Sequence, residues 1–132
     1  MKKNGFTFIE LLVVITIIGV VFAAGIVSYT SISKNSRNAR RKADLEAVRQ
    51  ALEMCRSIDK EYPSSISSSI TCPVSATVVT LKSTPTDPKP CAGHEDGLYS
   101  YDPDFPAVGE YRLTADCYEG PIGPEPYSVT NP

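Results

Sequence analysis

The sequence predicts an α+β fold, in which one long N-terminal helix packs its C-terminal half against a small antiparallel β-sheet of three to four strands. Three observations support this prediction. An apolar run covers residues 6–27, an apolar stripe with helical spacing follows it, and residues near the C-terminus alternate between apolar and polar. All 11 prolines lie at or beyond Pro63, so none interrupts the predicted helix.

The apolar run is long enough to cross a membrane. Residues 8–27 are 20 positions with two polar side chains, Glu10 and Thr16. Twenty helical residues span about 30 Å, the thickness of a bilayer core. A cleaved secretory signal is the alternative, because Lys2 and Lys3 form a basic start. However, the run exceeds the apolar core of roughly 7 to 15 residues found in such signals, and no small-residue cleavage site followed by a polar break ends it.

The following segment is polar but keeps helical periodicity. Its apolar stripe consists of Leu45, Val48, Leu52 and Cys55, with Ala43, Ala47 and Ala51 beside it. The other face carries opposite charges three and four residues apart: Glu46, Arg49, Glu53 and Arg56. We expect one helix over about residues 6–58, whose stripe holds the outer domain.

The C-terminal region shows modest strand signals between loops rich in proline and glycine. The segment of residues 76–82 is rich in β-branched side chains, and residues 98–101 form a short segment with two tyrosines. Residues 111–117 alternate, with Tyr111, Leu113, Ala115 and Cys117 on one face. Residues 127–130 are expected to add an edge strand.

Glu10 is the unusual residue of the apolar run. A carboxylate in hydrocarbon is costly unless it is neutralised or paired, and no Lys or Arg lies between Asn4 and Lys34. Residues 2–15 read KKNGFTFIELLVVI. The segment has a basic leader that is followed by Gly5 and Phe6, and then by Glu10 before a long apolar tail. Together these features resemble the prepilin signature of type IV pilins and type II secretion pseudopilins.

The resemblance implies processing and assembly residues. A prepilin peptidase would cut between Gly5 and Phe6 and methylate Phe6, and Glu10 would pair with the α-amine of a neighbouring subunit. Removal of five residues from the 132 leaves 127, with 11 basic and 15 acidic side chains. Many members of the family carry a proline late in the apolar run, which this chain lacks, so any melting of the helix on assembly would use Gly19 to Gly25.

The implied organisation has three parts: a leader (1–5), a transmembrane and filament-core half-helix (6–28), and an extracytoplasmic head (29–132). The implied function is a structural subunit of a type IV pilus, anchored in the inner membrane by one span before assembly and extracellular in the filament afterwards. Its partners would be prepilin peptidase, an inner-membrane assembly platform, the lipid bilayer and other copies in a helical filament. A major pseudopilin and a membrane-anchored extracytoplasmic binding domain are the alternatives.

A basic stretch follows the apolar run and consists of Lys34, Arg37, Arg40, Arg41 and Lys42. By the positive-inside rule it would keep the C-terminal domain in the cytoplasm. The cysteines and the prepilin signature favour export instead. We therefore expect the stretch to contact headgroups before assembly and acidic patches of neighbours afterwards, with a solvated helix face as the alternative.

The four cysteines predict two disulfides in the exported part, and three pairings are possible. Cys55–Cys72 is favoured because it needs only local reach, and Cys91–Cys117 because it is similar to the C-terminal disulfide loop of many pilins. A zinc site would instead use Cys91 and His94 with Cys72 or Cys117, but it lacks a matching second pair of ligands.

Several acidic residues gather in the same region: Asp87, Glu95, Asp96, Asp102 and Asp104. Residues 86–88 (Thr-Asp-Pro) are similar to a tripeptide near a calcium loop in major pseudopilins, so calcium is one interpretation and solvated turns are the other. The rest of the calcium-loop pattern does not follow, which favours a pilin. No cofactor, enzymatic activity or nucleic-acid partner is predicted, because the chain has one histidine, no phosphate-binding loop and a slightly acidic balance.

Overall fold

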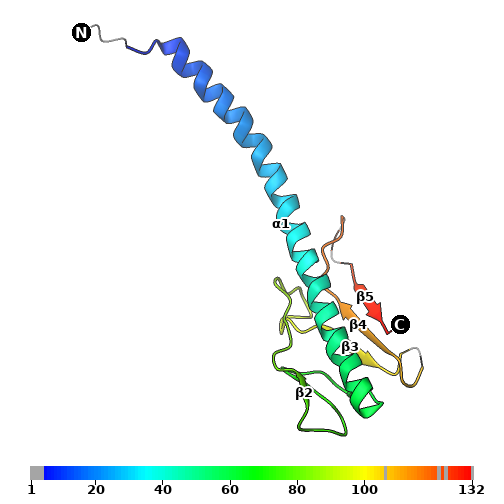
Figure 1. Ribbon diagram of the computed structural model, residues 1–132. Coiled ribbons are helices and arrows are strands. Elements are labelled where there is room, and N and C mark those ends of the chain that lie inside the picture. The colour runs from blue at the N-terminus through cyan, green and yellow to red at the C-terminus, as the bar shows by residue number, and fades with distance from the viewer. Residues whose placement is uncertain (1–4, 106, 122, 124, 132) are drawn as a thin grey trace. The chain divides into compact units, whose positions relative to one another are not determined.

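The computed structural model describes residues 5–105, 107–121, 123 and 125–131, without the side chains of Val27 and Ser28. Leader residues 1–4, including Lys2 and Lys3 of the predicted signature, lie outside this description. Helix α1 (Phe8–Asp59) comes first, and five strands follow it (Figure 1): β1 (Ile70–Thr71), β2 (Val79–Leu81), β3 (Ser100–Pro103), β4 (Tyr111–Ala115) and β5 (Tyr127–Thr130). The α+β class with one long N-terminal helix is therefore confirmed.

The chain forms two compact units, Met1–Asn35 and Ser36–Pro132. The described part of the first unit is helical from Phe8 onward, and the second unit holds the rest of α1 and all five strands. The boundary at residue 29 between the filament-core half-helix and the head stays a prediction, and residues 29–32 and 34–36 are exposed in the single chain.

In the second unit, α1 uses one stripe to cover the sheets. Leu45, Val48, Leu52 and Cys55 are fully buried, as the periodicity predicts, and Ala51 is buried with them. The expectation for Ala43 and Ala47 was wrong, because both are exposed. Each lies two residues from Leu45, and at about 100° per residue that turns them about 200° away from the core.

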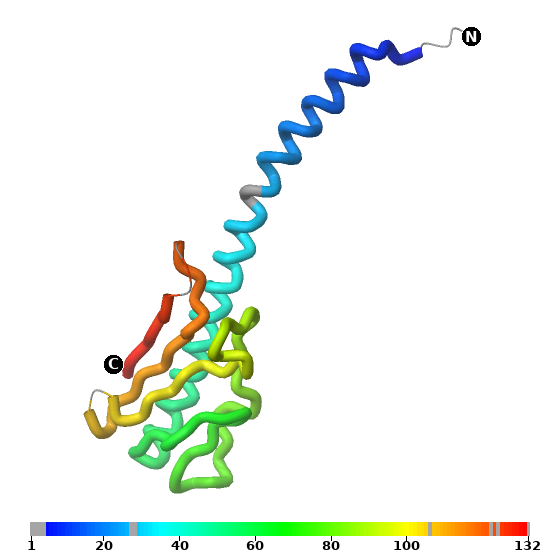
Figure 2. Tube along the Cα trace, turned by 180° about the vertical axis from the view of Figure 1, so that it is seen from behind, coloured from blue at the N-terminus to red at the C-terminus, as the bar shows by residue number. Residues whose placement is uncertain are grey.

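The main sheet has three antiparallel strands in the order β3-β4-β5. Figure 2 shows it from the side opposite to Figure 1. Central strand β4 alternates as predicted: Tyr111, Leu113 and Ala115 are fully buried, and Cys117 just beyond the strand is 4% exposed. Strand β5 forms the expected edge and aligns Val129 with Leu113. The core of the head thus lies between one stripe of α1 and one face of this sheet.

Two strand predictions need correction. The strand predicted at 76–82 is shorter, Val79–Leu81, and pairs with β1 in a separate two-stranded sheet instead of joining the main one. Strand β1 has only two residues, which is too short for a periodic signal. Strand β3 lies two residues later than the predicted 98–101 and ends at Pro103, which is tolerated because β3 is an edge strand.

Candidate functional site

The N-terminus of α1 is closed by a reciprocal contact between Thr7 and Glu10. The Glu10 carboxylate accepts hydrogen bonds from the backbone N–H and the hydroxyl of Thr7, both at 2.7 Å. The Thr7 hydroxyl in turn accepts the N–H of Glu10 at 3.4 Å. This arrangement is a capping box, which satisfies N–H groups that have no partner in the first turn of a helix.

Sequence reasoning missed Thr7, although a Thr followed three residues later by Glu before an apolar run is a recognised helix start. In the described subunit Glu10 therefore has a partner in its own chain. Its pairing with a neighbour's α-amine is a separate event, which stays a prediction.

The predicted scissile bond lies just before this cap. Gly5 and Phe6 precede the helix, and the first helical bond runs from the N–H of Leu11 to the carbonyl of Thr7 at 3.3 Å. Phe6 is 90% exposed, and a Cβ placed on Gly5 would meet nothing within 4 Å. The backbone at the predicted cleavage site is thus free of helical hydrogen bonds among the described residues.

The apolar part of α1 has no protein cover in the single chain. Every residue from 8 to 26 is exposed, including Phe8 at 81% and Val20 at 73%. The helix is long and apolar enough to cross a membrane, with none of its most apolar window buried. The Thr16 hydroxyl donates a hydrogen bond to the carbonyl of Val13 at 2.8 Å. Glu10 carries the only charge among residues 8–26.

The two glycines predicted as weak points lie inside a continuous helix. Neither Gly19 nor Gly25 has a neighbour within 4 Å of the position that a Cβ would take. No close packing therefore requires glycine at either position in the single chain. Melting on assembly stays a prediction about the filament.

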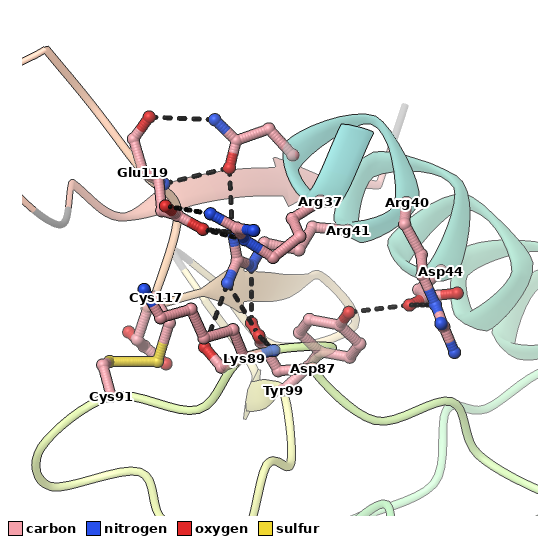
Figure 3. Close-up of polar contacts among 12 residues, drawn as sticks. Arg37, Arg40, Arg41, Asp44, Asp87, Lys89, Cys91, Tyr99, Cys117 and Glu119 are labelled. Atoms are coloured by element: carbon pink, nitrogen blue, oxygen red, sulfur yellow. Dashed lines mark hydrogen bonds and ion pairs between the residues drawn. A yellow bond between two sulfur atoms is a disulfide. The ribbon is translucent and has the colours of Figure 1, made fainter. Parts of the chain in front are cut away.

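Two of the five cations of the basic stretch, Arg37 and Arg41, form ion pairs inside the head. Arg41 is fully buried and forms a two-pronged ion pair with Asp87, with N–O distances of 2.7 and 2.8 Å (Figure 3). Arg37 binds Glu119 in the same way, its Nη2 donating to Oε2 at 2.8 Å. Asn38 bridges the two pairs, because its Oδ1 accepts from Arg41 at 2.9 Å and its Nδ2 donates to the carbonyl of Glu119 at 2.9 Å.

This cluster replaces the expected contacts of Arg37 and Arg41 with neighbours. Because a buried charge is costly without a partner, Arg41 is committed to its own chain. Arg37 is half-buried and is held by its ion pair with Glu119. The hydrogen bonds of Asp87 raise the pKa of Arg41 above its usual value. The bond from Arg37 lowers the pKa of Glu119 to about 2. Arg40, 63% exposed and 3.9 Å from Asp44, stays available to solvent and partners.

The calcium interpretation does not fit the described carboxylates. Asp87, the centre of the pseudopilin-like tripeptide, is taken by Arg41. The other four are held in local contacts, with Glu95 accepting from Gly93, Asp96 from Leu98, Asp102 from Arg112 and Asp104 from Gly109. Among the residues that the structure describes, no group of three or more His, Cys, Asp or Glu side chains could hold a metal ion.

Both disulfides are present, and they use the two favoured pairs. Cys55 is bonded to Cys72 and Cys91 to Cys117, with Cα–Cα distances of 5.1 and 5.5 Å. The alternative zinc site is thereby excluded, since all of its thiolates are oxidised. His94 is a loop residue whose Nδ1 lies 3.7 Å from a carboxylate oxygen of Asp116.

Comparison with known proteins identifies the N-terminal segment. Residues 1–26 match the family described as the prokaryotic N-terminal methylation motif. No curated protein and no solved structure matches the chain. The motif is the class III signal typical of type IV pilins and pseudopilins, and the long helix packed on small antiparallel sheets is a pilin-like architecture. The chain therefore begins with a motif typical of prepilins, and the helix that follows is long and apolar enough to cross a membrane.

Proposed function

We propose that the protein is a structural subunit of a type IV pilus, which polymerises by helix–helix packing after removal of the leader. The observation that supports this most is the exposed apolar surface of residues 8–26, which lies within the methylation motif of residues 1–26. A surface that is apolar all round requires lipid or other apolar helices as its surroundings. In this proposal, lipid surrounds the apolar surface in the precursor, and helices of other copies surround it in the filament.

In this proposal, prepilin peptidase cuts between Gly5 and Phe6 and methylates Phe6. The new α-amine of one copy pairs with Glu10 of a neighbour, which removes the cost of an isolated carboxylate in an apolar core. The inner-membrane assembly platform lifts subunits into the filament, and the disulfide-linked heads lie outside.

A pilus is favoured over the major pseudopilin of a type II secretion system by the role of Asp87. The calcium loop suggested by residues 86–88 would need this carboxylate, which is committed to the buried Arg41. A membrane-anchored binding domain is a weaker alternative, because such a domain has no need of the methylation motif.

The test is to image shed surface filaments and to weigh their subunit in the natural host, with and without substitution of Gly5. We expect filaments of a 127-residue chain carrying one added methyl group and two disulfides. Gly5→Glu should leave an uncut, membrane-bound chain and no filaments, whereas Gly19→Ala should be cut normally. Filaments built from an uncut chain would contradict the proposal, and loss of secretion without loss of surface filaments would point to a pseudopilin.

A further inference from the structure

The second disulfide, Cys91–Cys117, joins two segments that lie outside the regular elements. Cys91 lies in the long connection between β2 and β3, and Cys117 lies in the turn after β4. Among the described residues, no backbone–backbone hydrogen bond joins residues 87–91 to residues 117–119. The backbone ladder of a sheet therefore does not bring these two cysteines together before their bond forms.

Arg41 of α1 holds the segment that leads to Cys91. Its Nη2 donates to the carbonyl of Lys89 at 3.1 Å, and its Nε and Nη2 donate to the carboxylate of Asp87 (Figure 3). The same carboxylate accepts the N–H of Lys89 at 2.7 Å, which fixes the chain between the two residues. Two residues of chain span at most about 7 Å, so a fixed Lys89 leaves Cys91 little freedom.

Neighbouring side chains on the same turn of α1 hold the segment that follows Cys117. Asn38 donates to the carbonyl of Glu119 at 2.9 Å and accepts its N–H at 3.0 Å. Arg37 pairs with the carboxylate of Glu119, and Asn38 also accepts from Arg41 at 2.9 Å. Glu119 is two residues from its cysteine, as Lys89 is on the other side, so one turn of α1 holds the chain close to both ends of the bond.

We propose that this turn of α1, residues 37–41, is a template for the second disulfide. A free loop of 26 positions brings its ends together rarely, because closing it costs conformational entropy. Bonding needs Cα atoms no more than about 7 Å apart, and those of Cys91 and Cys117 lie 5.5 Å apart. Binding of both segments to α1 raises the effective concentration of one thiol at the other, and the bond then locks the docked arrangement. The template acts within one chain and so does not depend on the proposed function.

The test uses oxidised glutathione as the oxidant. One cysteine thiolate of a pair attacks the glutathione disulfide and releases one glutathione thiolate, and the second cysteine thiolate then displaces the other glutathione. In total, two protein thiols and one glutathione disulfide give one protein disulfide and two glutathione thiols. The oxidant is the same for both pairs of cysteines, so their rates differ only through the protein.

The experiment is oxidative refolding of the full-length chain in detergent, starting from its reduced and unfolded form. Samples are quenched with an alkylating agent, and the two disulfides are counted separately by peptide mass spectrometry. We expect Arg41→Met to slow formation of Cys91–Cys117 at least tenfold. The rate of Cys55–Cys72 should change less than twofold, because Cys55 lies about 21 Å further along α1.

Two further variants separate the template from general stability. Asn38→Ala releases Glu119 without changing any charge, and it should also slow the second disulfide alone. Arg40→Met removes an exposed cation of the same turn and should leave both rates unchanged. If Arg41→Met and Asn38→Ala form the second disulfide at the wild-type rate, or if both disulfides slow to the same degree in both variants, α1 is not a template and the inference is wrong.

Discussion

Arg41 is the most consequential single side chain of the head. It is fully buried and joins α1 to the segment around Asp87, while its Nη2 also donates to the carbonyl of Lys89 at 3.1 Å. Removal of one partner of a buried ion pair leaves the other charge without compensation, which is more damaging than loss of the attraction itself.

We therefore expect Arg41→Met to lower the free energy of unfolding of the head by about 3 kcal/mol. Arg40→Met, which removes an exposed cation 3.9 Å from its partner, should change it by less than about 1 kcal/mol. Near-ultraviolet circular dichroism of the full-length protein in detergent, followed through thermal unfolding, measures both. The double variant Arg41→Met, Asp87→Leu should regain much of the loss, and equal losses for Arg40 and Arg41 would contradict the role of burial.

Glu10 gives a second prediction at the level of one residue. Glu10→Ala should reduce filament number and length strongly, because the α-amine of the neighbouring copy would lose its counter-charge in the apolar core. Thr16→Val is the control, since it removes a polar group of the same segment whose hydroxyl bonds only its own helix. Electron microscopy of shed filaments gives the count, and normal filaments from Glu10→Ala would end the pairing hypothesis.

At the level of elements, periodicity was a better guide than composition. The 3-4-3 stripe of α1 and the alternation of β4 each fix which side chains are buried, because each element turns its residues through a constant angle. Ala43 and Ala47 were misplaced by the opposite approach, which grouped residues by type without considering their rotation around the helix, whereas Ala51 is buried as expected. Ala47 belongs to the exposed side although Leu45 and Val48 flank it.

The polar part of the site was harder to predict, because its contacts join residues far apart in the chain. Arg37 and Glu119 are separated by 82 positions, and neither has a local pattern that names its partner. A run of cations followed by a polar helix is typical of a solvated face, so burial of Arg41 has no sequence signal. Thr7 differs, since a Thr three residues before a Glu at the start of an apolar run is a local pattern that predicts a helix start.

A pair of valines tests the role of the stripe. Val48→Ala in the buried stripe should cost about 2 kcal/mol of head stability, from lost apolar burial and the space left behind. Val108→Ala makes the same chemical change at a side chain that is 90% exposed and should cost less than about 0.5 kcal/mol. Thermal unfolding at neutral pH compares them, and a similar cost at both sites would mean that the stripe is not the main support of the head.

At the level of the whole molecule, stability should depend on acid through Glu119. Its pKa is about 2 in the folded head, chiefly because of Arg37, against an ordinary value of 4.5. Because the pKa of Glu119 is lower in the folded than in the unfolded state, its ion pair with Arg37 contributes fully to the free energy of unfolding above about pH 4.5. This contribution is lost as the pH falls through about 2.

Glu119→Gln should therefore be less stable than the wild type at pH 6, by at most about 3 kcal/mol, and the difference should shrink steadily between pH 4.5 and pH 2. Thermal unfolding midpoints of both proteins across this range give the measurement. If the difference between the two unfolding midpoints stays constant down to pH 2, Glu119 acts through its shape and not through its charge.

The order of the disulfides along the chain has a consequence for how the protein matures. Cys55–Cys72 and Cys91–Cys117 link partners 17 and 26 positions apart, and the two loops neither overlap nor enclose each other. When a chain crosses a membrane from its N-terminal side, each cysteine of the first pair meets its partner before the second pair emerges. In the proposed export of the head, vectorial oxidation would therefore yield the native links without an isomerase to reshuffle them.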